Sequence, residues 1–436
     1  MQLTLEQVLQ MAPDEASAKA GKALQLAKHW QSLGQNDQVL WGECQGSALY
    51  QVRVDLSNLG YKCSCPSRKF PCKHVLGLFL LAVTNRSAFL EQSSPPWVAE
   101  WLTKRLEATG KKEGKAAEKE LKPVDEKAQQ KRAEQRHERV CDGLERLDLW
   151  MKDLVRGGLA GLETKGAALW DEQARRLVDA QAPGLALRVR RLGELPGSGP
   201  EWPRLLLGEL GRIKLALRAF EQIEQLEPSL ANDLRQWIGW TITSQELEKV
   251  GEKVIDDWLI LGQWIDEEDK LRVQRTWCLG QASKRLTLML QFVIGPTSFP
   301  IPLLPGTQQR GAMICYPGSG RQRAQFAFRE EQAVPIKSSF AGHATIEAFL
   351  LSVAVDLARQ PWLQAFGCLL NQVTLARSQE RWFLRDSTGQ SLPLIDFDAW
   401  KLLALSGGHP FDLAGEWDGI KLRPLGVFLN GSYRLI

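Results

Sequence analysis

The segment from Tyr61 to His74 constrains this chain more than any other, because it contains three of the eight cysteines and one of the five histidines. Cys63 and Cys65 lie two positions apart, so on an extended segment both thiols project from the same face. Cys72 and His74 are also two positions apart, and they stand at the start of an apolar run with the pattern of a helix. We therefore expect four ligand side chains from two short elements to converge on one point.

Zinc is the ion that this ligand set favours. Three thiolates and one imidazole fill a tetrahedral site and leave no open position for water. We therefore expect one structural Zn²⁺ per chain, held by Cys63, Cys65, Cys72 and His74. Three alternatives stay open: cysteines packed as small apolar side chains, a disulfide, and a catalytic zinc with a free position. Cys44, upstream of the cluster, is expected in the core or, alternatively, as a spare ligand.

The spacing Cys-x-Cys, six residues, Cys-x-His resembles the SWIM zinc finger, whose pattern is CxC followed at a variable distance by CxH. The flanking segments from Leu40 to Gly46 and from Tyr50 to Asp55 are similar to those of bacterial SWIM proteins, so the resemblance covers residues 35–85. The resemblance implies a binding module, as in remodelling-type ATPases, Mu-related transposases and signalling kinases. It also implies that the protein is a companion of MoxR-type ATPases and of von Willebrand A-domain proteins.

Length and composition predict a globular protein of two or three domains, since the chain has 436 residues of which 44% are hydrophobic. The first ten residues lack a basic region and an unbroken apolar run, so we expect no secretory signal there. The longest apolar stretches, Val75–Val83 and Ala348–Ala358, are too short to span a bilayer. We therefore expect a soluble, cytoplasmic protein with reduced cysteines and no membrane partner.

Four regions follow from changes of pattern along the chain. They are a SWIM zinc finger module with flanking helices (residues 1–103), a charged linker (104–139), a helical domain (140–253) and a tryptophan-rich α+β domain (254–436). The linker has almost no large apolar residues, so it cannot bury enough surface to fold alone. The expected fold class is thus multidomain α+β: a small ββα-type zinc finger module, an all-α middle domain and a mainly antiparallel α+β C-terminal domain.

Hydrophobic periodicity predicts the individual elements. A helical stripe from Ala16 to Trp30 ends at Gly34. The apolar helix after His74 must be covered by that first helix and by Trp97 and Trp101, or by a partner. Further helices are expected at Leu144–Val155, Leu185–Leu192, Leu205–Leu226 and Thr345–Arg359. Strands are expected at Val39–Cys44, Tyr50–Asp55, Trp258–Trp264, Leu271–Gly280, Leu286–Ile294, Arg323–Arg329, Arg381–Arg385, Ile420–Arg423 and Val427–Leu429.

No Walker A loop, dinucleotide-binding glycine turn, HExxH, GxSxG or kinase signature occurs in the sequence, so we do not expect an enzyme. The function that we expect is a non-catalytic zinc-binding adaptor whose finger binds protein, DNA or RNA. One alternative is a scaffold subunit of a MoxR-type ATPase and von Willebrand A-domain system without nucleic-acid binding. A second is an enzyme of unrecognised type. No small-molecule substrate is indicated.

Basic residues near the cysteine cluster are the candidate contacts to nucleic acid or to a partner. They are Arg53, Lys62, Arg68, Lys69 and Lys73. Such side chains could contact phosphates. They could equally compensate the net negative charge that three thiolates give a bound Zn²⁺. A second group of arginines, at residues 188, 190 and 191, is expected on a solvated helix face, with phosphate binding as the alternative.

Overall fold

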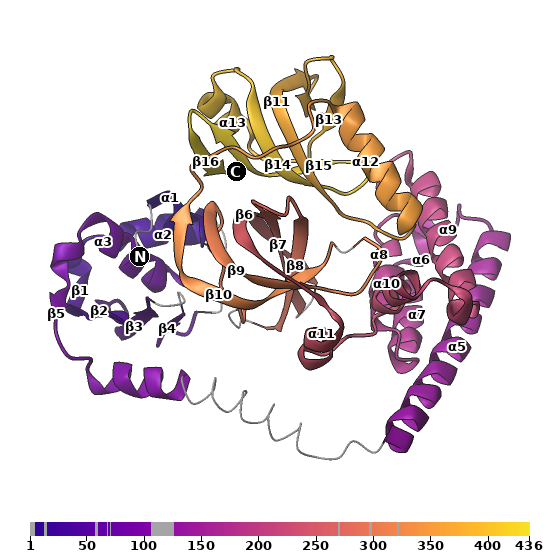
Figure 1. Ribbon diagram of the computed structural model, residues 1–436, viewed down its shortest axis with the longest axis horizontal. Helices are drawn as coiled ribbons and strands as arrows, with labels where there is room; N and C mark the ends of the chain where they lie inside the picture. The colour runs from indigo at the N-terminus through magenta and orange to yellow at the C-terminus, as the bar shows by residue number, and fades with distance from the viewer. Residues whose placement is uncertain are drawn as a thin grey trace.

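In the computed structural model, the chain forms an N-terminal module built on a sheet, a helical middle region and two C-terminal sheets (Figure 1). This confirms the predicted α+β class. The structure describes residues 5–12, 15–56, 60–67, 69, 71–105, 126–268, 271–295, 299–320 and 322–436. Within these ranges, no helix is both long enough and apolar enough to cross a membrane.

The N-terminal module (residues 5–105 as described) contains a five-stranded sheet in the order β4-β3-β2-β1-β5. Its strands are β1 Trp30–Gln35, β2 Val39–Gln45, β3 Leu49–Asp55, β4 Tyr61–Cys63 and β5 Leu90–Glu91. The predicted hairpin of β2 and β3 is confirmed, but the module is larger than a ββα finger. The helix predicted through Trp30 is wrong, because Trp30 starts β1, where its buried indole N–H donates to the carbonyl of Leu24 at 2.7 Å.

The apolar helix α3 is covered on the inner face of this sheet. The helices here are α1 Leu5–Gln10, α2 Glu15–Ala23 and α3 Lys73–Thr84, with 3₁₀ turns at Ala27–His29 and Arg86–Ala88. Val52 and Val54 of β3 belong to the same core as α3, and α2 packs on α3, as predicted. Trp97 and Trp101 do not cover α3, contrary to the prediction. They lie in a helix of residues 96–105 that packs on the outer face of the sheet.

The middle region is helical and shares one apolar core. Its elements are α5 Glu126–Arg156, α6 Leu162–Lys165, α7 Ala168–Asp179, α8 Pro183–Leu192, α9 Trp202–Glu221, a 3₁₀ turn at Ile223–Gln225, α10 Pro228–Ile238 and α11 Ser244–Val250. The boundary expected at residue 139 falls inside α5, because this helix continues from the charged segment into the apolar stripe. Residues 104 and 105 of the expected linker belong to the preceding helix, and residues 106–125 lie outside the described residues.

The next five strands form a small, partly closed barrel. They are β6 Glu252–Glu268, β7 Leu271–Gly280, β8 Leu286–Ile294, β9 Thr307–Cys315 and β10 Ala324–Pro335, in the order β10-β9-β6-β7-β8. Neighbours are antiparallel, and a parallel bridge between Leu288 and Arg323 brings β8 to β10. This is the strand order of OB-fold barrels. β9 was not predicted from the sequence.

The last sheet has one face on the barrel and the other under two helices. Its elements are α12 Ile346–Arg359, β11 Phe366–Ser378, β12 Arg381–Arg385, β13 Ser391–Pro393, α13 Ala399–Ser406, β14 Phe411–Trp417, β15 Leu422–Leu429 and β16 Ser432–Leu435. The two strands expected at 420–423 and 427–429 are the single strand β15. Trp277 and Leu288 of the barrel share a core with Leu369 and Leu425 of this sheet. The last sheet thus covers part of the barrel face formed by β7 and β8. These are the second and third strands of the barrel, and OB-fold barrels bind ligands on the face of those strands.

Polar contacts join these parts. Arg188 of α8 is half-buried, with its Nε enclosed; its guanidinium carbon lies 4.3 Å from the ring centre of Trp237, and it donates a hydrogen bond to Gln364 beside the last sheet. Burial lowers the pKa of Arg188 to about 9. Arg191 pairs with Asp266 of β6 at 2.8 Å. The arginines of α8 are therefore contacts between folded parts, and the expectation of a wholly solvated face is wrong for Arg188.

Candidate metal centre

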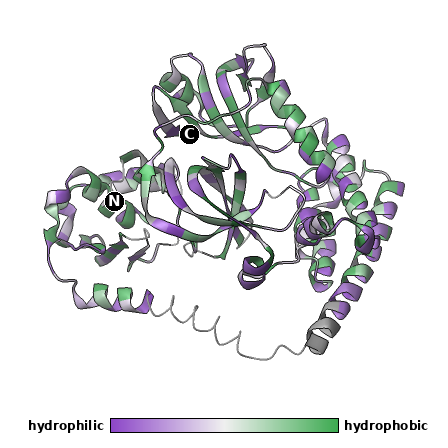
Figure 2. Ribbon diagram, viewed as in Figure 1, coloured by the Kyte–Doolittle hydropathy of each residue, from purple (hydrophilic) through white to green (hydrophobic). Residues whose placement is uncertain are grey.

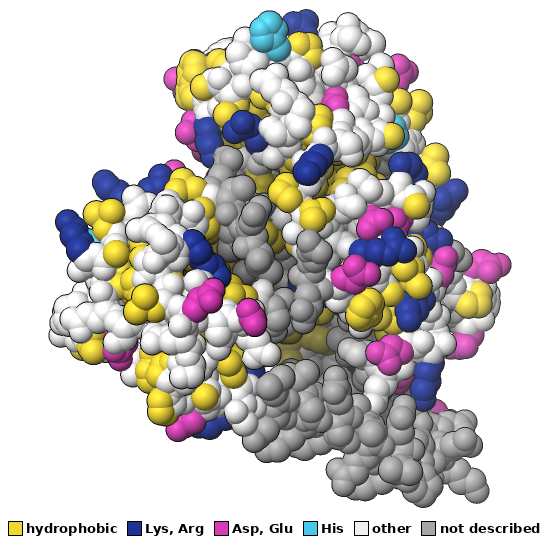
Figure 3. Space-filling model, turned by 60° about the vertical axis from the view of Figure 1, so that its left-hand side comes forward, with side chains coloured by type: hydrophobic (Ala, Val, Ile, Leu, Met, Phe, Trp, Pro, Cys, Tyr) yellow, Lys and Arg dark blue, Asp and Glu magenta, His cyan; other side chains and the backbone are white. Residues whose placement is uncertain are grey.

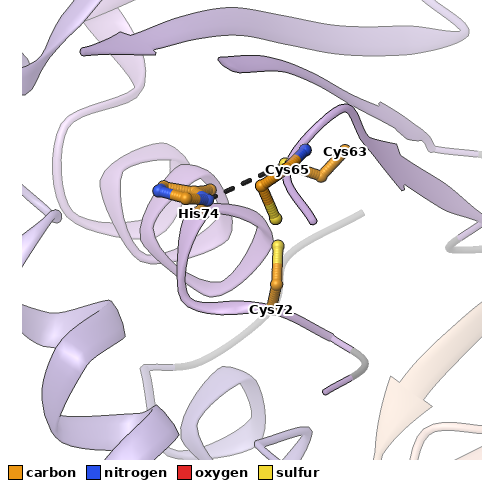
Figure 4. A group of neighbouring side chains, drawn as sticks. All are labelled: Cys63, Cys65, Cys72 and His74. Atoms are coloured by element: carbon orange, nitrogen blue, oxygen red, sulfur yellow. Dashed lines mark hydrogen bonds between the residues drawn. The ribbon is translucent and has the colours of Figure 1, made fainter. Parts of the chain in front are cut away.

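Two neighbouring elements bring the four predicted ligands together (Figure 4). Cys63 ends β4, which is held in place by pairing with Val52 of β3, and Cys65 follows in the turn. Cys72 is the N-cap of α3, and His74 lies in its first turn. All four side chains point toward one another from these two elements.

The distances fit one zinc ion. The four ligand atoms lie within 4.8 Å of one another, and the Sγ of Cys63 is 3.8 Å from the Nδ1 of His74. Zn–S and Zn–N bonds of about 2.3 and 2.0 Å at the tetrahedral angle separate S from N by about 3.5 Å. The cluster is therefore preformed close to the geometry that a structural Zn²⁺ requires, and four protein ligands leave no position for a catalytic water.

Burial and thiol chemistry also suit a metal. Cys72 and His74 are buried, with 2% and 5% of their surface exposed. The pKa of Cys72 is lowered to about 4, first by the hydrogen bond from the Cys63 thiol and also by contacts with His74 and the N–H of Val75. The pKa of Cys63 is raised, mainly because it donates that hydrogen bond and because it is buried. The cluster thus favours one thiolate before a cation binds, and zinc would displace the remaining thiol protons.

A hollow of about 450 Å³ lies beside the ligands on the same side of the sheet. Lys69 and Lys73 line it, together with Tyr50, whose ring packs 4.8 Å from the imidazole of His74. These two lysines are placed to compensate the net negative charge of a zinc bound by three thiolates and one imidazole. Cys44 is buried in the adjoining core and is not a member of the four-ligand group.

The remaining basic candidates lie elsewhere. Arg53 and Lys62 are paired neighbours on β3 and β4, and their side chains project to the outer face of the sheet, away from the metal ligands. Arg68 lies outside the described residues. The basic residues therefore form two groups on opposite faces, whereas the sequence suggested one group around the cluster.

The outer group lines a second hollow, of about 350 Å³, between the sheet and the helix of residues 96–105. We call it the outer hollow. Its lining residues are Gln51, Arg53, Lys62, Trp97, Glu100, Trp101, Lys104 and Arg105. Four of these eight side chains are cationic and one is acidic. Sequence reasoning missed the roles of Trp97, Trp101, Lys104 and Arg105, because nothing local indicates that this helix folds back on the sheet.

Arg53 is the central side chain of the outer hollow. Its guanidinium carbon lies 5.1 Å from the ring centre of Trp97 and 5.8 Å from that of Trp101. Only 8% of Arg53 is exposed, and its Nε is buried without a hydrogen-bond partner among the described residues. Burial lowers the pKa of Arg53, but a guanidinium stays charged in proteins. The hollow thus holds a stacked, partly desolvated cation.

On the face seen in Figure 3, Lys and Arg side chains are interspersed with acidic and apolar ones. The net charge is only +4. Local groups of cations, such as the outer hollow, therefore say more about binding than the net charge does.

Comparison with known families agrees with the geometry of the cluster. Residues 50–82 match the SWIM zinc finger, and residues 135–238 match the SWIM-associated four-helix bundle domain, which here spans α5 to α10. No curated protein and no solved structure matches the chain. Cys63, Cys65, Cys72 and His74 thus form the site of one structural zinc. The chain thus contains a segment similar to the SWIM zinc finger and, after it, a segment similar to the SWIM-associated four-helix bundle domain.

Proposed function

We propose that this protein is a non-catalytic adaptor whose zinc finger binds single-stranded nucleic acid through the outer hollow. The observation that carries the proposal is the stacking of Arg53 on Trp97 and Trp101 within a group of four cations. Proteins that bind single strands combine cations, which follow the phosphates, with aromatic rings, on which bases stack. The closed ligand set supports a structural rather than a catalytic zinc.

Charge balance favours a polyanion over a neutral partner. Arg105 lies 3.6 Å from Asp55, and Lys104 lies 3.8 Å from Glu100 at the exposed rim. Arg53 and Lys62 have no ion pair with an acidic side chain among the described contacts. A phosphate beside Arg53 would supply the anion that a desolvated guanidinium favours. Trp97 is only half-buried, so part of its ring is available to a base.

Zinc has an indirect part in this binding. Cys63 and Lys62 are adjacent on β4, a strand of three residues. Fixing Cys63 in the metal site therefore fixes the backbone that carries Lys62 to the other face. Binding should depend on zinc although the ion does not touch the ligand. We further propose that the protein acts in the cytoplasm, where its eight cysteines, none of them in a disulfide and three of them zinc ligands, would stay reduced.

The test is fluorescence anisotropy with 12-nucleotide single-stranded RNA and DNA and with duplex DNA, using zinc-loaded full-length protein at several salt concentrations. Saturable binding to single strands, weakening steeply with salt, is expected. Lys62→Gln and Lys104→Gln should each reduce the salt slope by about 1. Lys249→Gln, an exposed lysine at the end of α11, is the matched control and should leave the slope unchanged.

Stacking is tested separately at Trp97. Trp97→Ala should weaken binding about tenfold, which corresponds to the loss of 1–3 kcal/mol for one stacked base, whereas Trp97→Phe should retain most of the affinity. If the zinc-loaded protein shows no saturable binding at low salt, or if these substitutions leave the affinity unchanged, the outer hollow is not a nucleic-acid site. Binding of an acidic peptide instead of single strands would equally contradict the proposal.

A further inference from the structure

The hollow of about 450 Å³ beside the zinc ligands, which we call the inner hollow, has the size of a small-molecule site. Its walls come from α2, from the turn between β2 and β3, from the loop that carries Cys65, and from the start of α3. It lies on the opposite face of the sheet from the outer hollow and takes no part in the binding proposed above.

The walls of the inner hollow offer positive charge and hydrogen-bond donors. Lys69 and Lys73 are its exposed cations. Beyond its first turn, α3 is hydrophobic (Figure 2), so Lys73 is the only charged residue of that helix. Hydroxyl groups come from Ser47, Tyr50 and Ser67. None of the lining residues that the structure describes is acidic, so these walls favour an anionic ligand.

His74 adds a donor whose position zinc fixes. Its Nδ1 lies 3.8 Å from the Sγ of Cys63 and faces the thiols, and its second ring nitrogen points away from them (Figure 4). An imidazole that binds zinc through Nδ1 is neutral and carries its proton on Nε2. With zinc bound, the Nε2–H group of His74 is therefore a hydrogen-bond donor on the side away from the metal.

This donor has no acceptor within the described part of the chain. Only 5% of His74 is exposed, yet its Nε2 is not among the fully enclosed polar atoms that lack a partner. Nε2 therefore keeps contact with open space, and the inner hollow is the space that His74 lines. Histidines that bind zinc almost always donate their other N–H to a carboxylate, a carbonyl or water. A ligand oxygen in the inner hollow would complete this pattern.

The charge of the site favours a carboxylate. Three thiolates and a neutral imidazole leave a bound Zn²⁺ with one negative charge in excess, and Lys69 and Lys73 outweigh it by one positive charge. A carboxylate balances that surplus, whereas a phosphate monoester brings a charge of about −1.5 to −2 at pH 7. We propose that the inner hollow binds a small monocarboxylic acid, whose carboxylate accepts hydrogen bonds from the Nε2–H of His74 and from Lys73.

Calorimetric titration of the zinc-loaded, full-length protein in a carboxylate-free buffer tests the proposal. The probes are lactate, its neutral analogue lactamide, and methyl phosphate. Saturable binding of lactate is expected, with weaker binding of methyl phosphate and none of lactamide. Nuclear magnetic resonance of protein labelled with ¹⁵N in its histidines gives an independent signature. The Nε2–H proton of His74 should move downfield as lactate saturates the site, because it becomes hydrogen-bonded to an anion.

Substitutions in the walls test the charge, and His74 itself is left intact because it is a zinc ligand. Lys73→Gln should weaken lactate binding about tenfold through the loss of one hydrogen bond between charged groups, with the zinc content unchanged. Lys28→Gln is the matched control, at an exposed lysine of the same module that does not line the hollow. Ala16→Glu sets a tethered carboxylate on the α2 wall and should abolish binding, whereas Ala16→Gln should retain most of it.

Three results would overturn the proposal. One is the absence of saturable lactate binding together with an unmoved His74 signal. Another is tighter binding of methyl phosphate or lactamide than of lactate. The third is an equal effect of the two lysine substitutions, or of Ala16→Glu and Ala16→Gln. None of these measurements uses nucleic acid, so this proposal and the one for the outer hollow stand or fall separately.

Discussion

At the scale of single residues, the N-terminal module depends on the two-residue period of β4. Cys63 projects to the inner face and reaches the zinc site, whereas Lys62 projects to the outer face and reaches the outer hollow. One strand of three residues thus serves two surfaces. A shift of its register by one residue would exchange these two side chains and remove both sites.

Zinc content is the first prediction at this scale. Purified protein should carry one zinc per chain, as measured by elemental analysis of samples prepared without chelator. Cys63→Ser/Cys72→Ser should lose the metal, because two of four ligands are missing. Cys44→Ala should keep it, since Cys44 is buried in the core beside the site but is not a ligand. Metal-free wild type, or full zinc in the double variant, would refute the ligand assignment.

Asp386 gives a prediction about pH. Burial alone would raise the pKa of Asp386, but hydrogen bonds from the N–H groups of Ile346, Thr388 and Gln390 and from the Thr388 hydroxyl hold it below its ordinary value. A depressed pKa contributes stability above the unfolded-state value of about 3.9, and this is lost as the pH falls through the folded-state value.

Asp386→Asn should therefore lower the free energy of unfolding at neutral pH by about 1–3 kcal/mol, and the difference from wild type should shrink below about pH 4. Urea unfolding of the two proteins at pH 7 and pH 3.5 measures this. Asp396→Asn, at an exposed carboxylate, is the control and should change little at either pH. A difference that stays constant with pH would mean that the charge of Asp386 is not what stabilises the α12 cap.

At the scale of elements, the close packing of α2 and α3 depends on two glycines. A Cβ added at Gly77 would lie 2.7 Å from the Cβ of Leu24, and one added at Gly21 would lie 2.7 Å from the Cβ of Leu76. Alanine favours a helix over glycine by about 1 kcal/mol, but overpacking costs about 1–3 kcal/mol. Steric contact should therefore outweigh helix propensity at Gly77.

A matched pair of substitutions tests this balance. Gly77→Ala should lower the thermal midpoint of the N-terminal module. Gly208→Ala, on α9 with open space around the added Cβ, should raise the stability of the bundle by up to about 1 kcal/mol. Differential scanning calorimetry of both variants measures the effects. Stabilisation at both sites would show that α2 and α3 are not in close contact.

How well the sequence predicted an element depended on whether its signal is local. β7, β8 and β12 were predicted with the bounds that the structure gives them. β14 was missed because it is buried on both faces, so its residues do not alternate between apolar and polar. Trp30 was placed in a helix because the alanines before it continue a helical spacing by coincidence. Its contact with Leu24 overrides that pattern.

The two candidate sites also differ in whether their residues lie close together in the sequence. The zinc ligands lie within a dozen residues, so their spacing alone brings them together. The outer hollow requires Trp97 and Trp101 to pack against β2 and β3 from a helix that follows α3 in sequence. That pairing is tertiary, and the sequence carries no motif for it. Arg53 and Lys62 were identified as basic candidates, but the aromatic rings that give them a function were not.

At the scale of the whole molecule, each folded part has its own core, and a few specific contacts join them. Leu304, in the loop between β8 and β9, packs into the core of the N-terminal module. Asp233 of α10 accepts a hydrogen bond from the N–H of Ser319 at 2.7 Å. Glu416 of β14 accepts one from the indole of Trp277 at 2.6 Å. The bundle, the barrel and the last sheet therefore do not depend on the metal for their cores.

We expect zinc to order the N-terminal module and no part of the chain beyond it. Structural zinc supplies on the order of 10 kcal/mol in small metal-dependent folds, and here it links β4 to the start of α3. Loss of the metal should free both elements and, through β4, the wall of the outer hollow that carries Lys62.

Hydrogen exchange of Cys72→Ser/His74→Ala compared with wild type measures this effect. His409→Ala, at an exposed histidine in the C-terminal part, is the control. We predict faster exchange confined to the N-terminal module, strongest in β3, β4 and α3, with protection unchanged in the bundle, the barrel and the last sheet. Faster exchange throughout the chain would contradict a local metal site, and an unchanged N-terminal module would contradict a structural zinc.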